Sequence, residues 1–170
     1  MTYTADYWID SLGLAEHPEG GYFRQTYCSS DAIAADGLPG RFGGPRPVST
    51  AIYYLLRGNQ HSALHRLRAD EVWHHYAGSS LTLHLIHPDG RLTHSALGTT
   101  GGEAPQVVVP AGCWFGATVD DTDSYALVGC TVAPGFRMED FELGQLASLL
   151  EQYPQHEPLI RRLTSPGGSI

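Results

Sequence analysis

The stretch HSALHRLRADEVWHHYAGSSLTLHLI, residues 61–86, holds five of the nine histidines in the chain. Asp70 and Glu71 lie among these histidines. The β-branched and aromatic residues on either side of Gly78 are typical of strands that meet at a turn. The stretch therefore predicts a strand pair, and three interpretations of its histidines stay open: a metal site, an acid–base site, or ordinary strand positions.

Strand-like runs of the same kind continue through most of the chain. Turn signals such as Asp89-Gly90 separate them, and they cover residues 22–29, 49–56, 71–77, 81–87, 91–97, 106–110, 113–119 and 124–132. Many short strands at roughly ten-residue spacing indicate an antiparallel sandwich or barrel. The sequence therefore predicts an all-β fold.

The segments outside these strands are helical or loop-like. Residues 5–14 and 143–154 space their apolar residues as helices do, and residues 158–163 add a further turn. Residues 35–47 are rich in glycine and proline, which predicts an exposed and mobile loop. Nothing divides the chain, so we expect a single domain over residues 1–170.

The composition narrows the class of protein. A net charge of −8 argues against nucleic acid and against an anionic membrane surface, because both attract basic proteins. The start of the chain lacks the apolar segment of a signal peptide, and no apolar stretch reaches membrane-spanning length. We therefore expect a cytoplasmic protein whose three cysteines, Cys28, Cys113 and Cys130, are reduced and buried as small hydrophobic residues.

Two segments resemble the sequence motifs of the cupin superfamily. In residues 58–78, His65 is followed by Glu71 and then by Gly78, and residues 107–115, VVVPAGCWF, contain the Pro-x-Gly turn. Nearly the whole chain resembles the blocks of the DUF985 or Cupin_5 family, a group of uncharacterised RmlC-like proteins, in the segments HPEGGYFRQTY, STAIYYLL, HRLRADEVWHHYAG, VVVPAGCWFGA and VAPGFRMEDFELG. The resemblance implies a double-stranded β-helix, or jelly-roll barrel, with an internal pocket and a homodimer that pairs through its sheets.

The resemblance also implies a metal site, which this chain matches only in part. Of the four usual cupin ligands, His65 and Glu71 are present, whereas Leu67 and Phe115 stand where two further histidines would be. Because side chains alternate along a strand, His75 falls on the face of Glu71. His65, Glu71 and His75 could then hold a divalent metal such as Fe, Mn, Zn or Ni. The alternative is that no metal binds.

Acid–base chemistry is the second interpretation of the same residues. Some cupins are sugar-nucleotide epimerases, and the resemblance extends to them in fold. We expect His65 to act as the base, with Glu71 as the carboxylate that orients it. A tyrosine would serve as the acid, and the candidates are Tyr22, Tyr54, Tyr76 and Tyr125. The opposing interpretation is a buried ion pair without a catalytic role.

The remaining candidates would bind the substrate. Aromatic walls are expected from Tyr54, Trp73, Trp114 and Phe115, polar contacts from His75, and contacts at the barrel mouth from Glu19, Tyr22 and Arg24. Arg24 and Arg66 could hold an anionic group. His74 and His84 are expected to be ordinary strand residues. The predicted function is isomerase- or epimerase-like chemistry on a sugar or other polar small molecule; the alternatives are a binding or sensing module without turnover and a metal-dependent enzyme.

Overall fold

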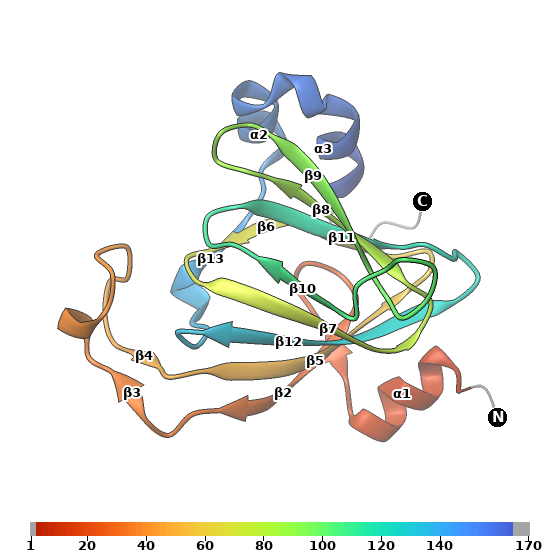
Figure 1. The fold of residues 1–170 in the computed structure, drawn as a ribbon, viewed down its shortest axis with the longest axis horizontal. Helices are drawn as coiled ribbons and strands as arrows, with labels where there is room; N and C mark the ends of the chain where they lie inside the picture. The colour runs from red at the N-terminus through yellow and green to blue at the C-terminus, as the bar shows by residue number, and fades with distance from the viewer. Residues whose placement is uncertain (1–2, 165–170) are drawn as a thin grey trace.

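The computed structural model describes residues 3–164, and two antiparallel sheets that face each other dominate it (Figure 1). The larger sheet has the order β1-β2-β5-β12-β7-β10, with bounds Ala15–Glu16, Tyr22–Cys28, Thr50–Arg57, Tyr125–Ala133, Asp70–Gly78 and Gln106–Val109. The smaller sheet has the order β13-β6-β11-β8-β9, with bounds Phe141–Leu143, His61–Leu67, Trp114–Val119, Leu81–Ile86 and Leu92–Leu97. A short ribbon pairs β3 (Ala32–Ile33) with β4 (Arg46–Pro47). The predicted all-β fold is confirmed.

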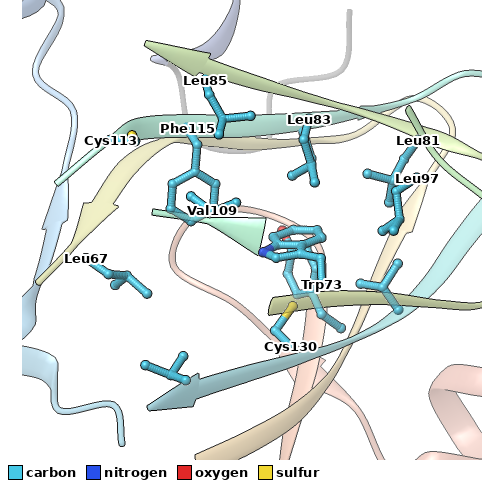
Figure 2. Packing of buried hydrophobic residues seen from close by; sticks show 14 of the residues in the cluster. Leu67, Trp73, Leu81, Leu83, Leu85, Leu97, Val109, Cys113, Phe115 and Cys130 are labelled. Atoms are coloured by element: carbon cyan, nitrogen blue, oxygen red, sulfur yellow. The ribbon is translucent and has the colours of Figure 1, made fainter. Parts of the chain in front are cut away.

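The alternation of side chains along each strand builds the core between the sheets. Trp73 is 1% exposed and lies at the centre of this core (Figure 2). On one side of it, Leu81, Leu83 and Leu97 are fully buried and fill the barrel. The opposite end of the barrel, where Leu67 lies, is not completely filled, and the candidate site is found there.

Short helices cover the outer faces of both sheets (Figure 1). α1 (Ala5–Leu12) begins at Thr4, whose hydroxyl accepts a hydrogen bond from the Tyr7 backbone N–H, and packs on the larger sheet. α2 (Leu146–Gln152) and α3 (Glu157–Leu163), joined by a 3-10 turn (Pro154–His156), pack on the smaller sheet. These helices agree with the predicted ones. No helix in residues 3–164 combines the length and the apolar character that crossing a bilayer requires.

The segment predicted as an exposed loop, residues 35–47, lies only partly at the surface. It begins with a 3-10 turn (Ala35–Gly37), but Phe42 is 6% exposed and packs into the main core. The Arg46 guanidinium is 1% exposed and donates two hydrogen bonds to the Asp140 carboxylate. The prediction of exposure was therefore wrong for these residues, because glycine and proline content gave no signal that one ring and one ion pair would anchor the segment.

The three cysteines are free thiols, as expected. Cys113 and Cys130 are buried, whereas Cys28 is exposed at the end of β2. The prediction of burial was wrong for Cys28.

Candidate functional site

A cavity of about 170 Å³ lies between the two sheets, at the end of the barrel away from Leu81, Leu83 and Leu97, which we call the leucine layer. Strand alternation supplies most of its wall, because residues two apart on β5, β6, β7 and β12 face the same side. The ionisable and polar lining residues are His17, Glu19, Gln25, Thr50, Tyr54, His65, Glu71 and Cys130. The apolar lining residues are Phe23, Ile52, Leu67, Trp73, Val132, Phe136 and Phe141. The cavity thus combines aromatic walls with three buried acids and bases, Glu19, His65 and Glu71, and the half-buried His17.

His65 is fixed in one tautomer by two contacts. Its Nδ1 lies 2.7 Å from the Ala63 carbonyl oxygen, which can only accept, so Nδ1 carries a proton. Its Nε2 lies 3.1 Å from Oε2 of Glu19, and the Ser62 hydroxyl donates to the other Glu19 oxygen at 2.8 Å. The carboxylate that orients His65 is therefore Glu19.

The protonation of this pair follows from its burial. Burial lowers the pKa of His65, against an opposing attraction from Glu71. Burial likewise raises the pKa of Glu19, against attraction from His17 and the hydrogen bond from Ser62. Both directions favour the uncharged forms, in which the protonated Glu19 carboxyl donates a hydrogen bond to Nε2 of His65.

Glu71 faces the same cavity and has a different partner. Its Oε2 accepts a hydrogen bond from the Trp73 indole N–H at 2.8 Å. Burial raises the pKa of Glu71 to about 7, although attraction from His65 acts in the opposite direction. No hydrogen bond or ion pair joins Glu71 to His65 among the residues that the structure describes. The predicted pairing of His65 with Glu71 is therefore corrected, and Glu71 remains available to a guest.

His17 is a site residue that sequence reasoning missed. Its Nδ1 accepts a hydrogen bond from the Glu19 backbone N–H at 3.2 Å, which leaves the proton of the neutral ring on Nε2. The ring packs edge-on against Phe23 with centroids 4.5 Å apart. Burial lowers the pKa of His17, against attraction from Glu19. The available signal was its position two residues before Glu19 in the segment HPEGG.

The turn that carries His17 and Glu19 is held tightly against the barrel. The Tyr54 hydroxyl donates to the Gly20 carbonyl oxygen at 2.7 Å. Gly21 has a φ of 72°, and a Cβ at this position would lie 2.6 Å from the Leu55 carbonyl oxygen. Only glycine therefore allows this close approach. The turn places two ionisable side chains inside the barrel instead of merely covering its mouth.

The structure brings together some of the predicted substrate-binding residues and not others. Glu19, Tyr54 and Trp73 line the cavity with His65 and Glu71. Phe115 is buried with its ring centroid 4.0 Å from that of His65, so it supports the imidazole from behind the lining.

Four predicted residues lie elsewhere, and these predictions are corrected. Tyr22 packs with α1 on the outer face of the larger sheet, and Arg24 is exposed. Trp114 packs against α2 and α3 on the outer face of the smaller sheet. His75 lies beyond the cavity, where its Nε2 is 3.1 Å from the Ser79 carbonyl oxygen.

The other candidates named from the sequence also lie outside the cavity. Tyr76 is 53% exposed, and the Tyr125 hydroxyl accepts a hydrogen bond from the Trp8 indole. Arg66 stacks on Trp114 and pairs with an exposed glutamate, Glu142. His74 and His84 are hydrogen-bonded strand residues, as expected.

The implied metal does not fit these residues. Residues 3–164 contain no group of three or more histidine, cysteine, aspartate or glutamate side chains arranged to hold a metal ion. Leu67 and Phe115 offer no lone pair, and the Ala63 carbonyl and Glu19 occupy both nitrogens of His65. The predicted set of His65, Glu71 and His75 is not assembled.

Two facing antiparallel sheets around an internal cavity define the class of β-barrel to which the cupins belong. The model of the family Cupin_5, described as Cupin superfamily (DUF985), matches residues 6–144, and the chain belongs to this family. The predicted family is thus confirmed.

Relatives of known sequence or structure agree with this assignment. The uncharacterised protein YML079W of Saccharomyces cerevisiae is 29% identical over 142 residues, which are 78% of this chain and 71% of the yeast protein. The structure of protein SO0799 from Shewanella oneidensis is 42% identical, with a TM-score of 0.87 over 97% of this chain and 99% of that one. A hypothetical protein from Leishmania major is 37% identical, with a TM-score of 0.87 over 95% and 99% of the two chains.

An enzyme also shares the fold at much lower similarity. Oxalate decarboxylase from Bacillus subtilis is 14% identical, with a TM-score of 0.55. The alignment covers 87% of this chain and 36% of the decarboxylase. This likeness extends to the fold alone.

Proposed function

We propose that the protein binds a small organic molecule in the barrel cavity and transfers a proton on it, as isomerases and epimerases do. The observation that carries the proposal is the position of Glu71: a carboxyl with a pKa of about 7 lines a cavity with aromatic walls. A base with a pKa near the working pH is efficient in proton transfer, because it both accepts and returns the proton readily.

The neighbouring groups support this role for Glu71. The Glu71 carboxylate would remove a proton from a carbon next to a carbonyl group, and the resulting carboxylic acid would return that proton to a second position of the same molecule. The Nε2–H of neutral His17 would donate a hydrogen bond to the enolate oxygen that forms meanwhile. The Tyr54 hydroxyl is not suited to be the acid, because burial raises its pKa well above the usual value and the hydroxyl already donates a hydrogen bond to the Gly20 carbonyl oxygen.

A binding module without turnover is the second candidate. The apolar part of the lining favours it, because three phenylalanine rings, Phe23, Phe136 and Phe141, join Trp73 around the cavity. Such a wall binds apolar surface whether or not a reaction follows. A binding module would return its ligand chemically unchanged.

Measurement of deuterium incorporation into a panel of carbonyl compounds distinguishes proton transfer from binding without turnover. The protein is incubated in D₂O with cyclic ketones, lactones and free pentoses and hexoses, and deuterium at carbons next to the carbonyl is measured by NMR. We expect exchange that Glu71→Gln slows by about 100-fold or more, the usual contribution of a general base.

The matched control is Glu142→Gln, which changes an exposed glutamate outside the cavity. It should exchange at the wild-type rate. Equal rates for Glu71→Gln and wild type, or binding of panel members without any exchange, would contradict proton transfer and leave the binding module.

A further inference from the structure

We infer that the cavity accepts small guests that carry no negative charge and rejects carboxylates of the same shape. The inference rests on the proposed function only in using the same cavity, and it holds with or without turnover. It concerns the class of molecule that enters, which neither the family nor the similar structures specify.

The first argument is the charge of the lining. All ten basic residues of the chain are arginines, and none of them lines the cavity. His65 and Glu19 share one proton, so this pair contributes no net charge. His17 holds its ring neutral, since Nδ1 accepts a hydrogen bond. Glu71 is therefore the residue that determines the net charge of the cavity lining. This charge is zero when Glu71 is protonated and negative when it is ionised.

The second argument is that the arginines near the cavity are already engaged. Arg46 forms its two hydrogen bonds with Asp140 and a further ion pair with Glu139. A neighbouring surface groove, which shares Leu67 and Phe141 with the cavity, is lined by Arg41, Arg66 and Arg68. There Arg66 pairs with Glu142 at 2.7 Å, and Arg41 and Arg68 each donate a hydrogen bond to the backbone carbonyl oxygen of the other. A buried anion needs a cationic or hydrogen-bonding partner to offset its lost hydration. The lining offers no cation, and an ionised Glu71 would repel the anion.

The third argument is size. A volume of about 170 Å³ lies below the roughly 300–1,000 Å³ of pockets for drug-sized ligands. It is close to the roughly 150 Å³ of an apolar protein cavity known to bind benzene. The guest inside the barrel is therefore about as large as one substituted ring, and a whole sugar nucleotide does not fit.

A neutral guest of this size would find complementary groups. His17 offers its Nε2–H, protonated Glu71 can donate to a carbonyl oxygen, and Gln25 and Thr50 add a side-chain amide and a hydroxyl. The aromatic walls would hold the ring. An amide, lactone or cyclic ketone matches this pattern.

Two matched pairs of probes test the inference by titration calorimetry: benzamide with benzoate, and nicotinamide with nicotinate. At pH 8 we expect each neutral amide to bind at least tenfold more tightly than its carboxylate. Because the anion can enter only when Glu71 is protonated, carboxylate binding should strengthen about tenfold from pH 8 to pH 6. Binding of the amides should change less.

Variants assign the effect to the cavity. Glu71→Gln should raise the affinity for the carboxylates at pH 8 about tenfold and abolish its pH dependence. Glu142→Gln, which changes an exposed glutamate that pairs with Arg66, should behave as wild type. A circular dichroism spectrum and a thermal transition check that each variant is folded.

Each outcome decides the inference separately from the proposed function. Carboxylates that bind as tightly as the amides at pH 8, or amides that do not bind, overturn the inference. Amides that bind with the expected preference while no compound undergoes exchange leave the inference standing and refute proton transfer. Exchange of an anionic substrate that depends on Glu71 would support proton transfer and refute the inference.

Discussion

Replacing Glu71 with glutamine should stabilise the protein at alkaline pH. In the folded state burial raises the pKa of this carboxyl from an ordinary 4.5 to about 7. Between these two values the folded chain binds more protons than the unfolded chain, so the stability of the wild type falls as pH rises through this window. Glutamine cannot titrate, and its amide oxygen can still accept the hydrogen bond from Trp73.

The magnitude follows from the two pKa values. Each tenfold change in proton affinity corresponds to about 1.4 kcal/mol, so ionised Glu71 costs the folded state about 3 kcal/mol at pH 8. At pH 5 the corresponding cost is under about 1 kcal/mol, because the carboxyl is protonated in the folded state. For a chain of this length, about 3 kcal/mol corresponds to a rise of roughly 6 °C or more in Tm.

The assay is urea unfolding followed by tryptophan fluorescence, for wild type and Glu71→Gln at pH 5 and pH 8. The free energy of unfolding of Glu71→Gln should exceed that of the wild type by a larger amount at pH 8 than at pH 5. Glu142→Gln controls for the loss of a glutamate, and because Glu142 is an exposed ion-pair partner, this change should shift stability by about 1 kcal/mol or less. A difference between Glu71→Gln and wild type that is the same at both pH values would refute the assigned ionisation of Glu71.

Three further predictions test other parts of the molecule. Glu19→Gln should leave urea stability nearly unchanged, because an amide can replace a protonated carboxyl beside His65, whereas a large loss would indicate an ion pair there. Asp140→Asn should cost about 3–5 kcal/mol by the same measurement, because it removes the buried carboxylate that pairs with Arg46 and leaves only the exposed Glu139 as an ionic partner; an unchanged midpoint would contradict this. We propose a homodimer through the outer face of the larger sheet, where Tyr76 is 53% exposed, and we expect light scattering to give twice the chain mass and Tyr76→Glu to give a monomer; a monomeric wild type would refute it.

The sequence allowed the fold to be predicted because hydrophobic periodicity and turn residues act locally. Short strands such as β8 and β12 follow directly from runs of β-branched and aromatic residues between turns. Strand β13 is three residues long, and β3 and β4 have two residues each, so no periodic pattern could reveal them. Their pairing depends on tertiary contacts, among them the buried Arg46.

The candidate site was predicted less completely, because successive side chains of a strand point to opposite faces of the sheet. Whether a residue faces the cavity therefore depends on its odd or even position in the strand, its parity. On β2, Phe23 and Gln25 line the cavity, so their neighbours Tyr22 and Arg24 point away from it. The same parity sends Trp114 outward to the helices. A choice between these alternatives requires the register, which residue types alone do not supply.

His75 shows a second limit of sequence reasoning. It has the same parity as Glu71 and Trp73, as expected, yet it lies too far along β7 to reach the cavity and bonds to Ser79 instead. The parity of a residue predicts which face of the sheet its side chain points to. How far the cavity extends along the strand depends instead on how much of the barrel the leucine layer fills. That filling is a property of all the strands together, and no single segment encodes it.

The chemistry open to this barrel follows from what surrounds His65 Nε2. This nitrogen is the one that could have bound an ion, and a carboxyl group from the turn before β2 lies 3.1 Å from it. The positions that could complete a ligand set carry Leu67 and Phe115, so removal of Glu19 alone would leave too few donors for a metal. A hydrogen bond between Glu19 and His65 therefore occupies the centre of the polar cluster, and the proton that the two groups share leaves this pair without net charge. Glu71 is then the group whose charge changes near neutral pH, and this is the reason that we propose proton transfer for this set of side chains.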